Sequence, residues 1–240
     1  MPFTPSKSQQ LTLDIGLRDG FRFESFYTDI NSENNETIRI LESFLSSTVQ
    51  QQNYLWGQKN SGKTHLLQAC CAKVAESLQP ITYIPLKFFV RVGPDIMNGL
   101  THSQFIAIDD IDVIIGNRNW EVALFNLINL TKENEQNLLL SSTQNPRRLD
   151  CTLPDLASRL IWGGSYQLHV LNDDEKHKAL QARALQRGFE LTDRVIEYLF
   201  KRYPRDIESL TQILNKLDEE SLRQKTLITI PFVKQVLTDS

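Results

Sequence analysis

The chain has 240 residues, of which 40% are hydrophobic and 23% are charged, so it can bury the core of one large domain or of two unequal ones. A net charge of -3 excludes an overall basic field that attracts nucleic acid, and three cysteines fit neither a disulfide framework nor a zinc site. No apolar run approaches the roughly 18 to 20 residues of a membrane span, so a cytoplasmic protein without membrane contact is predicted.

Residues 1–20 are polar and carry no sustained periodicity, which predicts a flexible tail. One short stretch of this tail alternates: Gln10 precedes Leu11, Leu13 and Ile15, and an extended backbone presents these three apolar side chains on one side. By itself such a stretch is typical of an edge strand, and it also suits a peptide that docks on a partner protein.

The next segments alternate between helical and strand patterns. The helical periodicity is clearest over residues 31–52, 65–77 and 120–133. Five short apolar strands are predicted: Tyr54–Trp56, Ile81–Ile84, Phe105–Ile108, Leu138–Ser141 and Tyr166–Val170. Continuous apolar strands that alternate with helices favour a five-stranded parallel sheet covered on both faces. The predicted fold class for residues 21–171 is therefore α/β.

After Val170 the strands end, and only helical patterns follow. A small all-α domain is predicted over residues 172–240, with the domain boundary near Leu171. Four helix starts are expected, at Asp173 or Asp174, at Thr192 or Asp193, at Pro204 and at Pro231, with Gly188 ending the first helix.

The segment GQKNSGKT, from Gly57 to Thr64, directly follows the first strand and opens the next helix. This is the complete P-loop pattern in its required strand–loop–helix context. Gly57 and Gly62 let backbone N–H groups face a polyphosphate, Lys63 adds a positive charge, and the Thr64 hydroxyl ligates Mg2+. His65, the next residue, is predicted on the nucleotide side. ATP or ADP with Mg2+ is the expected ligand.

A second acidic signal follows the third strand, which ends in Asp109 and Asp110. A P-loop fold needs an acid at this place to hold Mg2+, so Asp109 is the predicted magnesium-side carboxylate. Asp110 is predicted as a possible general base that orients the attacking water.

Together these motifs resemble the AAA+ ATPases, in particular the initiator branch typified by the bacterial replication initiator DnaA. The resemblance implies roles for four more residues. Thr143 lies where that family has its sensor-1 residue, and Phe26 lies in the aromatic segment that covers the adenine. Arg205 matches the sensor-2 arginine of the lid, and Arg159, in Leu156–Leu160, matches the arginine finger that reaches a neighbouring subunit's nucleotide.

Two differences from the initiators indicate which branch of the family the chain resembles. Initiators continue into a DNA-reading domain, whereas this chain ends at Ser240, and residues 85–104 are too few for the initiators' inserted helix beside the ordinary one. An initiator-like ATPase module with an early Gln-Leu-x-Leu peptide resembles the Hda family, which inactivates DnaA. In that family the peptide docks into the β sliding clamp of DNA polymerase III. Asp14 replaces the family's common proline.

The Hda resemblance implies a negative regulator of replication initiation, with DnaA and the clamp as partners and DNA contacted only through the clamp. It also implies a homodimer, hydrolysis of DnaA-bound ATP through Arg159, and weak or absent intrinsic ATPase activity. Two alternatives stay open: a helicase-loader-like ATPase with its own turnover, and a nucleotide-locked adaptor between clamp and initiator. Arg159 is alternatively a surface salt-bridge residue.

Overall fold

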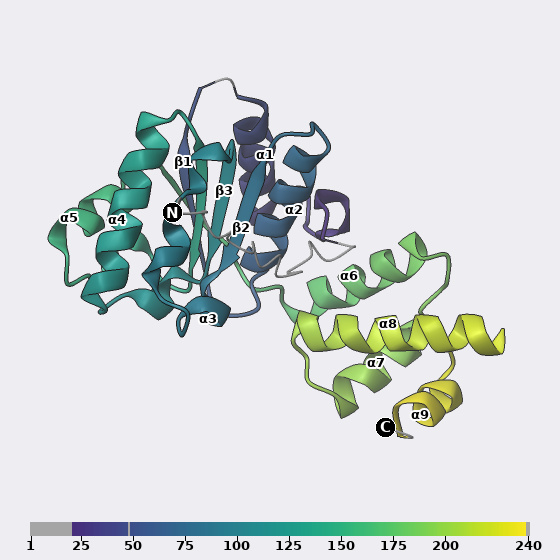
Figure 1. Ribbon diagram of the computed structural model, residues 1–240. Helices are drawn as coiled ribbons and strands as arrows, with labels where there is room; N and C mark the ends of the chain where they lie inside the picture. Colours follow the sequence, from purple (N-terminus) through teal and green to yellow (C-terminus); the bar gives the residue numbers. More distant parts are fainter. Residues whose placement is uncertain (1–20, 48, 239–240) are drawn as a thin grey trace, which may run out of the picture.

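The computed structural model describes residues 21–47 and 49–238, in which a five-stranded sheet is followed by a group of helices (Figure 1). The strands are β1 (Gln52–Trp56), β2 (Ile81–Pro85), β3 (Phe105–Asp109), β4 (Asn137–Ser142) and β5 (Gly164–Gln167). All pairings are parallel, in the spatial order β2-β3-β4-β1-β5. The predicted α/β class is confirmed, because helical crossovers return successive strands in the same direction.

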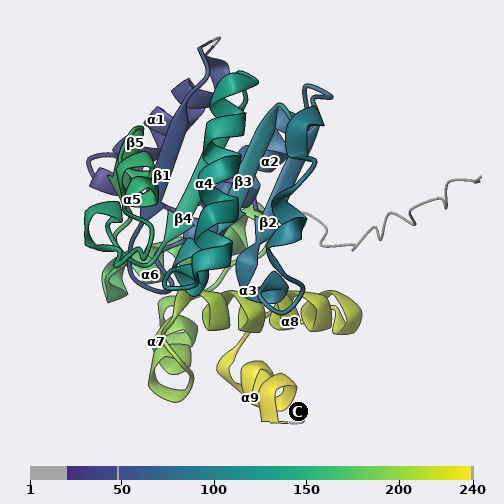
Figure 2. The same cartoon turned by 60° about the vertical axis from the view of Figure 1, so that its left-hand side comes forward.

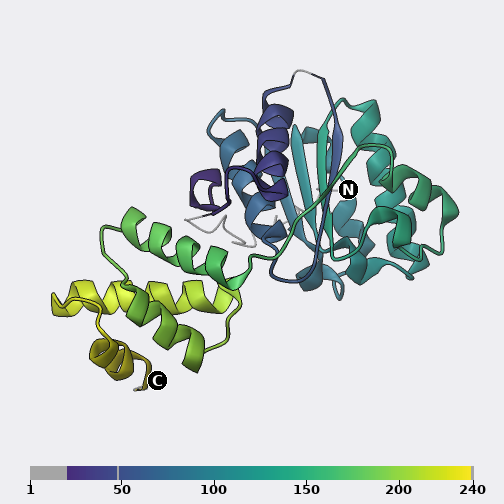
Figure 3. The same cartoon turned by 180° about the vertical axis from the view of Figure 1, so that it is seen from behind.

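Helices cover both faces of the sheet. Those of the α/β domain are α1 (Glu33–Ser46), α2 (Lys63–Ala75), α3 (Leu86–Phe89), α4 (Arg118–Glu133) and α5 (Pro154–Leu160). On β3, Phe105 and Ala107 pack in the core with α1 and α2, whereas Ile106 and Ile108 pack in the core with α4 and α5. Figure 2 shows α4 in front of the sheet, and Figure 3 shows α1 in front from behind. Successive strand residues therefore point into two separate cores.

Four further helices form a small domain with a core of its own, as predicted. They are α6 (Asp173–Gln186), α7 (Asp193–Arg202), α8 (Ile207–Gln224) and α9 (Ile230–Thr238), and we call them the lid helices. Their shared core includes Leu180, Leu199, Leu214 and Val233. Within the described part of the chain, no helix combines the length and the apolar character that crossing a bilayer demands.

The predicted position of the fifth strand is wrong by two to three residues. β5 begins at Gly164 because the backbone there lies directly against β1: a Cβ on Gly163 would lie 1.8 Å from the Gln52 carbonyl oxygen. Val170, predicted as the strand's end, lies beyond the pairing with β1 and is 38% exposed. Glycines allow this close approach, so pairing starts ahead of the apolar residues.

Two of the predicted helix starts are also wrong. Asn172, and not an aspartate after it, caps α6, since its side chain accepts from the Glu175 N–H at 2.9 Å and the Glu175 carboxylate accepts from the Asn172 N–H. Pro204 lies ahead of α8, whose cap is Asp206, bonded to the Ser209 N–H at 2.9 Å. In both places a side-chain acceptor for the unpaired N–H groups decides the start.

Two predicted helices are shorter in the structure. The helix predicted over residues 31–52 is α1, which ends at Ser46 because β1 already begins at Gln52. Residues 85–104 hold the single turn α3 and two 3-10 turns in place of an ordinary helix. Gly93 and Gly99, with φ of 113° and 78°, break the helical path there.

Candidate functional site

The P-loop joins the end of β1 to the start of α2, as predicted. Two of its glycines are required by close neighbours: a Cβ on Gly57 would lie 2.3 Å from the Leu168 carbonyl oxygen, and one on Gly62 would lie 2.4 Å from the Phe26 ring. Gly62 also has a φ of 95°, which other residues rarely adopt. The Ser61 hydroxyl is buried here without a hydrogen-bond partner among the described residues. A glycine cradle with an unpaired polar atom fits a polyphosphate.

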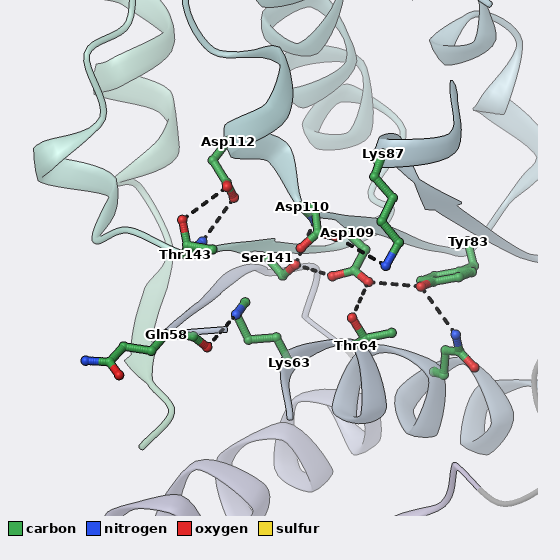
Figure 4. Close-up of polar contacts among 11 residues, drawn as sticks. Gln58, Lys63, Thr64, Tyr83, Lys87, Asp109, Asp110, Asp112, Ser141 and Thr143 are labelled. Atoms are coloured by element: carbon green, nitrogen blue, oxygen red, sulfur yellow. Dashed lines mark hydrogen bonds and ion pairs between the residues drawn. The ribbon is translucent and has the colours of Figure 1, made fainter. Parts of the chain in front are cut away.

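Lys63 lies inside this loop. Its ammonium group donates to the carbonyl oxygens of Gly57 at 2.8 Å and Gln58 at 3.0 Å (Figure 4). Burial lowers the pKa of Lys63, although the charges of Asp110 and Asp109 act in the opposite direction. A buried ammonium group held by loop carbonyls can bind an anionic oxygen such as that of a phosphate.

Asp109 is fully buried at the end of β3 and accepts three hydroxyl hydrogen bonds (Figure 4). Thr64 Oγ1 donates to its Oδ2 at 2.7 Å, and the Tyr83 hydroxyl donates to the same oxygen at 3.0 Å. The Ser141 hydroxyl donates to Oδ1. The predicted pair Thr64 and Asp109 is thus brought together, with the donor types that hold a hydrated Mg2+.

Tyr83 and Ser141 were not predicted as site residues. They come from β2 and β4, the two strands that flank β3. Their only signal in the sequence is that they are polar residues in or near apolar strands. The local sequence does not indicate which strands lie beside β3. Gln68, one turn after Thr64 on α2, donates to the Tyr83 hydroxyl at 3.3 Å and extends the network.

Asp110 follows with a left-handed backbone, φ 60° and ψ 50°. Its N–H donates to Ser141 Oγ at 2.9 Å, and its carboxylate lies 3.8 Å from the Lys87 ammonium. Burial raises the pKa of Asp110, and the charge of Asp109 adds to this effect. A strained residue with a raised pKa suits proton transfer, the role predicted for Asp110.

Thr143 lies just beyond β4, and its partner is Asp112. Its N–H donates to Asp112 Oδ1 at 3.0 Å and its hydroxyl donates to Oδ2 at 3.1 Å. Figure 4 shows this pair at the same edge of the sheet as Asp109, but on the side away from Thr64.

Arg205 faces the P-loop across a cavity of about 240 Å³. The P-loop contributes Gln58, Lys59 and Asn60 to this cavity, and the segment before α8 contributes Arg205. Arg205 donates to Asp173 Oδ2 at 2.8 Å and to the Phe200 carbonyl oxygen at 2.9 Å. The sensor-2 candidate is thus held by lid residues at the boundary between the lid and the P-loop.

His65 lies in the first turn of α2 and contacts residues 22–26, which include Phe26. His65 Nε2 lies 2.9 Å from the Arg22 carbonyl oxygen, and since a carbonyl only accepts, this nitrogen carries the proton. The Phe26 ring packs edge-on against the His65 ring at 5.2 Å between centroids. His65 therefore holds the segment 22–26 against α2, a contact that its sequence position did not predict.

The lid also forms hydrogen bonds with residues 22–26. Arg183 of α6 donates to the Ser25 carbonyl oxygen at 3.1 Å, and Gln186 donates to that of Glu24 at 2.9 Å. Burial lowers the pKa of Arg183. These bonds join residues 158 and 162 positions apart, so sequence reasoning missed them. Residues 22–26 thus connect the P-loop helix to the lid.

The buried His65 predicts a pH dependence of stability. Burial lowers the pKa of His65 to about 4, against about 6.5 in an unfolded chain. Below pH 6.5 the His65 imidazole binds a proton in the unfolded chain, whereas in the folded chain it stays neutral down to about pH 4. The free energy of unfolding therefore falls as the pH drops. The loss is about 2 kcal/mol by pH 5. Urea denaturation at pH 7 and pH 5 measures it.

His65→Gln is expected to lose this part of the pH dependence. His102→Gln is the matched control, because His102 is exposed on the surface. An equal pH 7 to pH 5 difference in both variants contradicts the assignment to His65.

Arg159 lies near the end of α5, the helix that Figure 1 shows on the side of the α/β domain away from the lid. Its guanidinium carbon is 3.6 Å from the centroid of the Trp162 ring and 5.5 Å from that of Phe125. Its Nε is buried without a hydrogen-bond partner among the described residues. The guanidinium is held by ring stacking and forms no ion pair within the described part of the chain.

Glu121 of α4 fixes the start of α5, and with it the position of Arg159. Its carboxylate is fully buried and accepts from the N–H groups of Gly116 at 2.7 Å, Thr152 at 3.1 Å and Leu153 at 2.7 Å. Burial alone raises the pKa of Glu121, but hydrogen bonds led by the Thr152 hydroxyl outweigh it and the pKa is lowered. The charged carboxylate is therefore the form that organises this loop.

The candidate clamp-binding residues Gln10, Leu11, Leu13 and Ile15 lie outside the described residues. Their docking role stays a prediction.

Two family models match the chain. The model of the bacterial DnaA ATPase domain matches residues 17–167, which is more than half of the chain. The model of the Hda lid domain matches residues 173–237.

Solved structures with the same fold include domain III of the Thermotoga maritima replication initiation protein DnaA, with 19% identity, a TM-score of 0.77, and coverage of 93% of this chain and 98% of that one. AMPPCP-bound DnaA from Aquifex aeolicus has 21% identity and a TM-score of 0.67, over 85% and 68% of the two chains. The Thermotoga maritima RuvB branch migration motor has 20% identity and a TM-score of 0.65, over 92% and 72%. At these identities the likeness extends to the fold alone.

Proposed function

The chain belongs to the DnaA-related AAA+ family and carries a lid of the Hda type, and from this premise we propose that it is a cytoplasmic negative regulator of replication initiation. In this proposal the protein binds ADP or ATP with Mg2+ and docks on the DNA-loaded β sliding clamp through residues 10–15. It then stimulates hydrolysis of the ATP held by DnaA, with Arg159 as an arginine finger in trans.

The observation that carries the proposal is the placement of Arg159. Arg159 belongs to α5, which Figure 1 shows on the side of the α/β domain away from the lid, and its guanidinium has no carboxylate partner within the described residues. An unpaired guanidinium at an outer edge suits a phosphate held by a neighbouring subunit. In trans it stabilises the charge that develops on the transferring phosphoryl group.

The nucleotide of this chain would be held by the residues of the P-loop edge. AMPPCP is bound in a DnaA of the same fold, which supports nucleotide binding here. Lys63 would contact phosphate oxygens, Thr64 and Asp109 would hold Mg2+, and Ser141 and Tyr83 would orient Asp109. Bound Mg2+ supplies charge neutralisation of the phosphates.

This nucleotide would act mainly on conformation. Arg205 faces the P-loop from the lid, and Arg183 and Gln186 tie the lid to residues 22–26. A nucleotide between the P-loop and Arg205 would favour one lid position, and residues 22–26 directly follow the tail that carries the clamp peptide. Contacts among the described residues therefore lead from α2 and the lid to residues 22–26, which follow the predicted clamp peptide in the sequence.

Reconstitution tests the function. The protein is added to ATP-loaded DnaA, clamp and DNA, and the loss of DnaA-bound ATP is followed with time. A dimer with two peptides on one clamp ring would gain avidity for the clamp. The clamp loaded onto DNA should therefore accelerate the loss of DnaA-bound ATP. No change in DnaA-bound ATP with folded protein overturns the proposal.

A second candidate function is ATP turnover by this chain itself, as in a helicase loader. The intact contacts of Thr64 and Asp109, and the raised pKa of Asp110, favour it. Steady-state ATP hydrolysis by the isolated protein separates the two candidates. Robust turnover without DnaA or clamp, abolished in Asp110→Asn, is the result that favours the loader.

A further inference from the structure

An open cavity of about 410 Å³ lies at the opposite end of β1 from the P-loop. Its wall is formed by residues 50–53 at the start of β1, by the last turns of α4, and by residues 162–164 at the start of β5. We call it the Trp162 pocket, because Trp162 lines it, contacts Arg159 and is 48% exposed. The nucleotide site does not use it.

The charge at this pocket is positive and unbalanced. The Lys132 ammonium lies 4.1 Å from the centroid of the Trp162 ring, and the Arg159 guanidinium carbon lies 3.6 Å from it. No aspartate or glutamate lines the pocket. In the described part of the chain neither cation forms an ion pair. Two like charges held on one indole repel each other, and an anion placed beside them relieves that repulsion.

The pocket also offers a buried hydrogen-bond donor. Asn53 lines it, is 2% exposed, and its Nδ2 has no hydrogen-bond partner within the described residues. A buried amide left unpaired costs about 1–3 kcal/mol, so such a group points to an acceptor that arrives from outside. This observation is independent of the charges and calls for the same chemistry, an oxygen anion.

We propose that the Trp162 pocket receives a carboxylate side chain of the partner protein, the one whose bound ATP is contacted by Arg159. This contact anchors the partner beside the arginine finger. The carboxylate pairs with Lys132, and Trp162 covers its apolar stem. Asn53 Nδ2 is fully buried, so it donates to the carboxylate after its side chain rotates toward the pocket. This inference rests on the proposed function and adds the contact that recognises the partner.

A nucleic-acid phosphate fits the pocket less well. Strand tracking requires a row of Lys and Arg, whereas Lys132 is the single cation in the lining. The chain also carries a net charge of -3. One ammonium group and one amide donor, those of Lys132 and Asn53, suit a single carboxylate.

Lys132→Gln tests the proposal, with Lys178→Gln as the matched control. Both lysines are exposed, and Lys178 lies on α6, away from the pocket. The probe is the ATPase domain of DnaA loaded with AMPPCP, so that no hydrolysis occurs during the titration. Lys132→Gln is expected to raise Kd roughly tenfold, Lys178→Gln to leave it unchanged, and Lys132→Arg to restore it.

At saturating partner, the rate of hydrolysis of DnaA-bound ATP should be the same for Lys132→Gln as for the wild type. Equal Kd values for the Lys132→Gln and Lys178→Gln variants contradict the proposed carboxylate site in the Trp162 pocket, while the proposed regulatory function remains. Weakened binding of a single-stranded oligonucleotide, with DnaA binding intact, also contradicts the carboxylate site and assigns the pocket to nucleic acid. Failure of the wild type to bind DnaA at all removes the proposed function as well.

Discussion

Arg159→Ala is expected to abolish the stimulation of DnaA-bound ATP hydrolysis, lowering that rate by about 10³- to 10⁵-fold. The reason is geometric and electrostatic. The guanidinium is delocalised and can form two parallel hydrogen bonds to a pair of phosphoryl oxygens, which alanine cannot replace. Single-turnover hydrolysis of ATP preloaded on DnaA, with the clamp on DNA, measures the effect.

Arg159→Lys is the informative companion, because it keeps the charge and loses the planar fork. We expect it to lose most of the activity too. Both variants remove stacking on Trp162, so nucleotide binding and the melting temperature must be matched to the wild type first. Wild-type rates in Arg159→Ala would identify an adaptor that bridges clamp and initiator without acting on ATP.

Lys63→Ala is expected to weaken nucleotide binding by at least roughly 100-fold, or about 2.7 kcal/mol. Lys63 is the only cation that the P-loop buries among the described residues, and its ammonium is already held by the Gly57 and Gln58 carbonyl oxygens. Removing it leaves phosphate charge without a partner in a partly desolvated loop. Titration with a fluorescent ADP analogue gives the two dissociation constants.

Lys73→Ala serves as its control, since Lys73 is on the same helix and pairs at the surface with Glu76. The melting temperature of the wild type should rise with added ADP, and that of Lys63→Ala should not. Should Lys63→Ala bind ADP as tightly as the control, the P-loop of this chain is not a nucleotide site.

Much of the candidate nucleotide site could be predicted from the sequence because its parts are contiguous. The P-loop occupies eight successive positions between a strand and a helix, and each residue type has its own backbone or charge requirement. Asp109 could also be predicted, since it ends a fully buried strand after a P-loop. Helix starts were less accurate: Asn172 and Asp206 act as caps through side-chain hydrogen bonds that compete with neighbouring candidates.

By itself, therefore, the sequence determined the α/β class, the P-loop and the place of its acidic partner, because these depend on periodicity and on residues adjacent in the chain. Only the tertiary structure decided that Tyr83 and Ser141 hold Asp109, that Arg183 ties the lid to Ser25, and that Asn53 is left unpaired. Those facts depend on strand order and on contacts between distant segments. Such contacts form when separate apolar faces pack together, and no local pattern encodes which polar groups then meet.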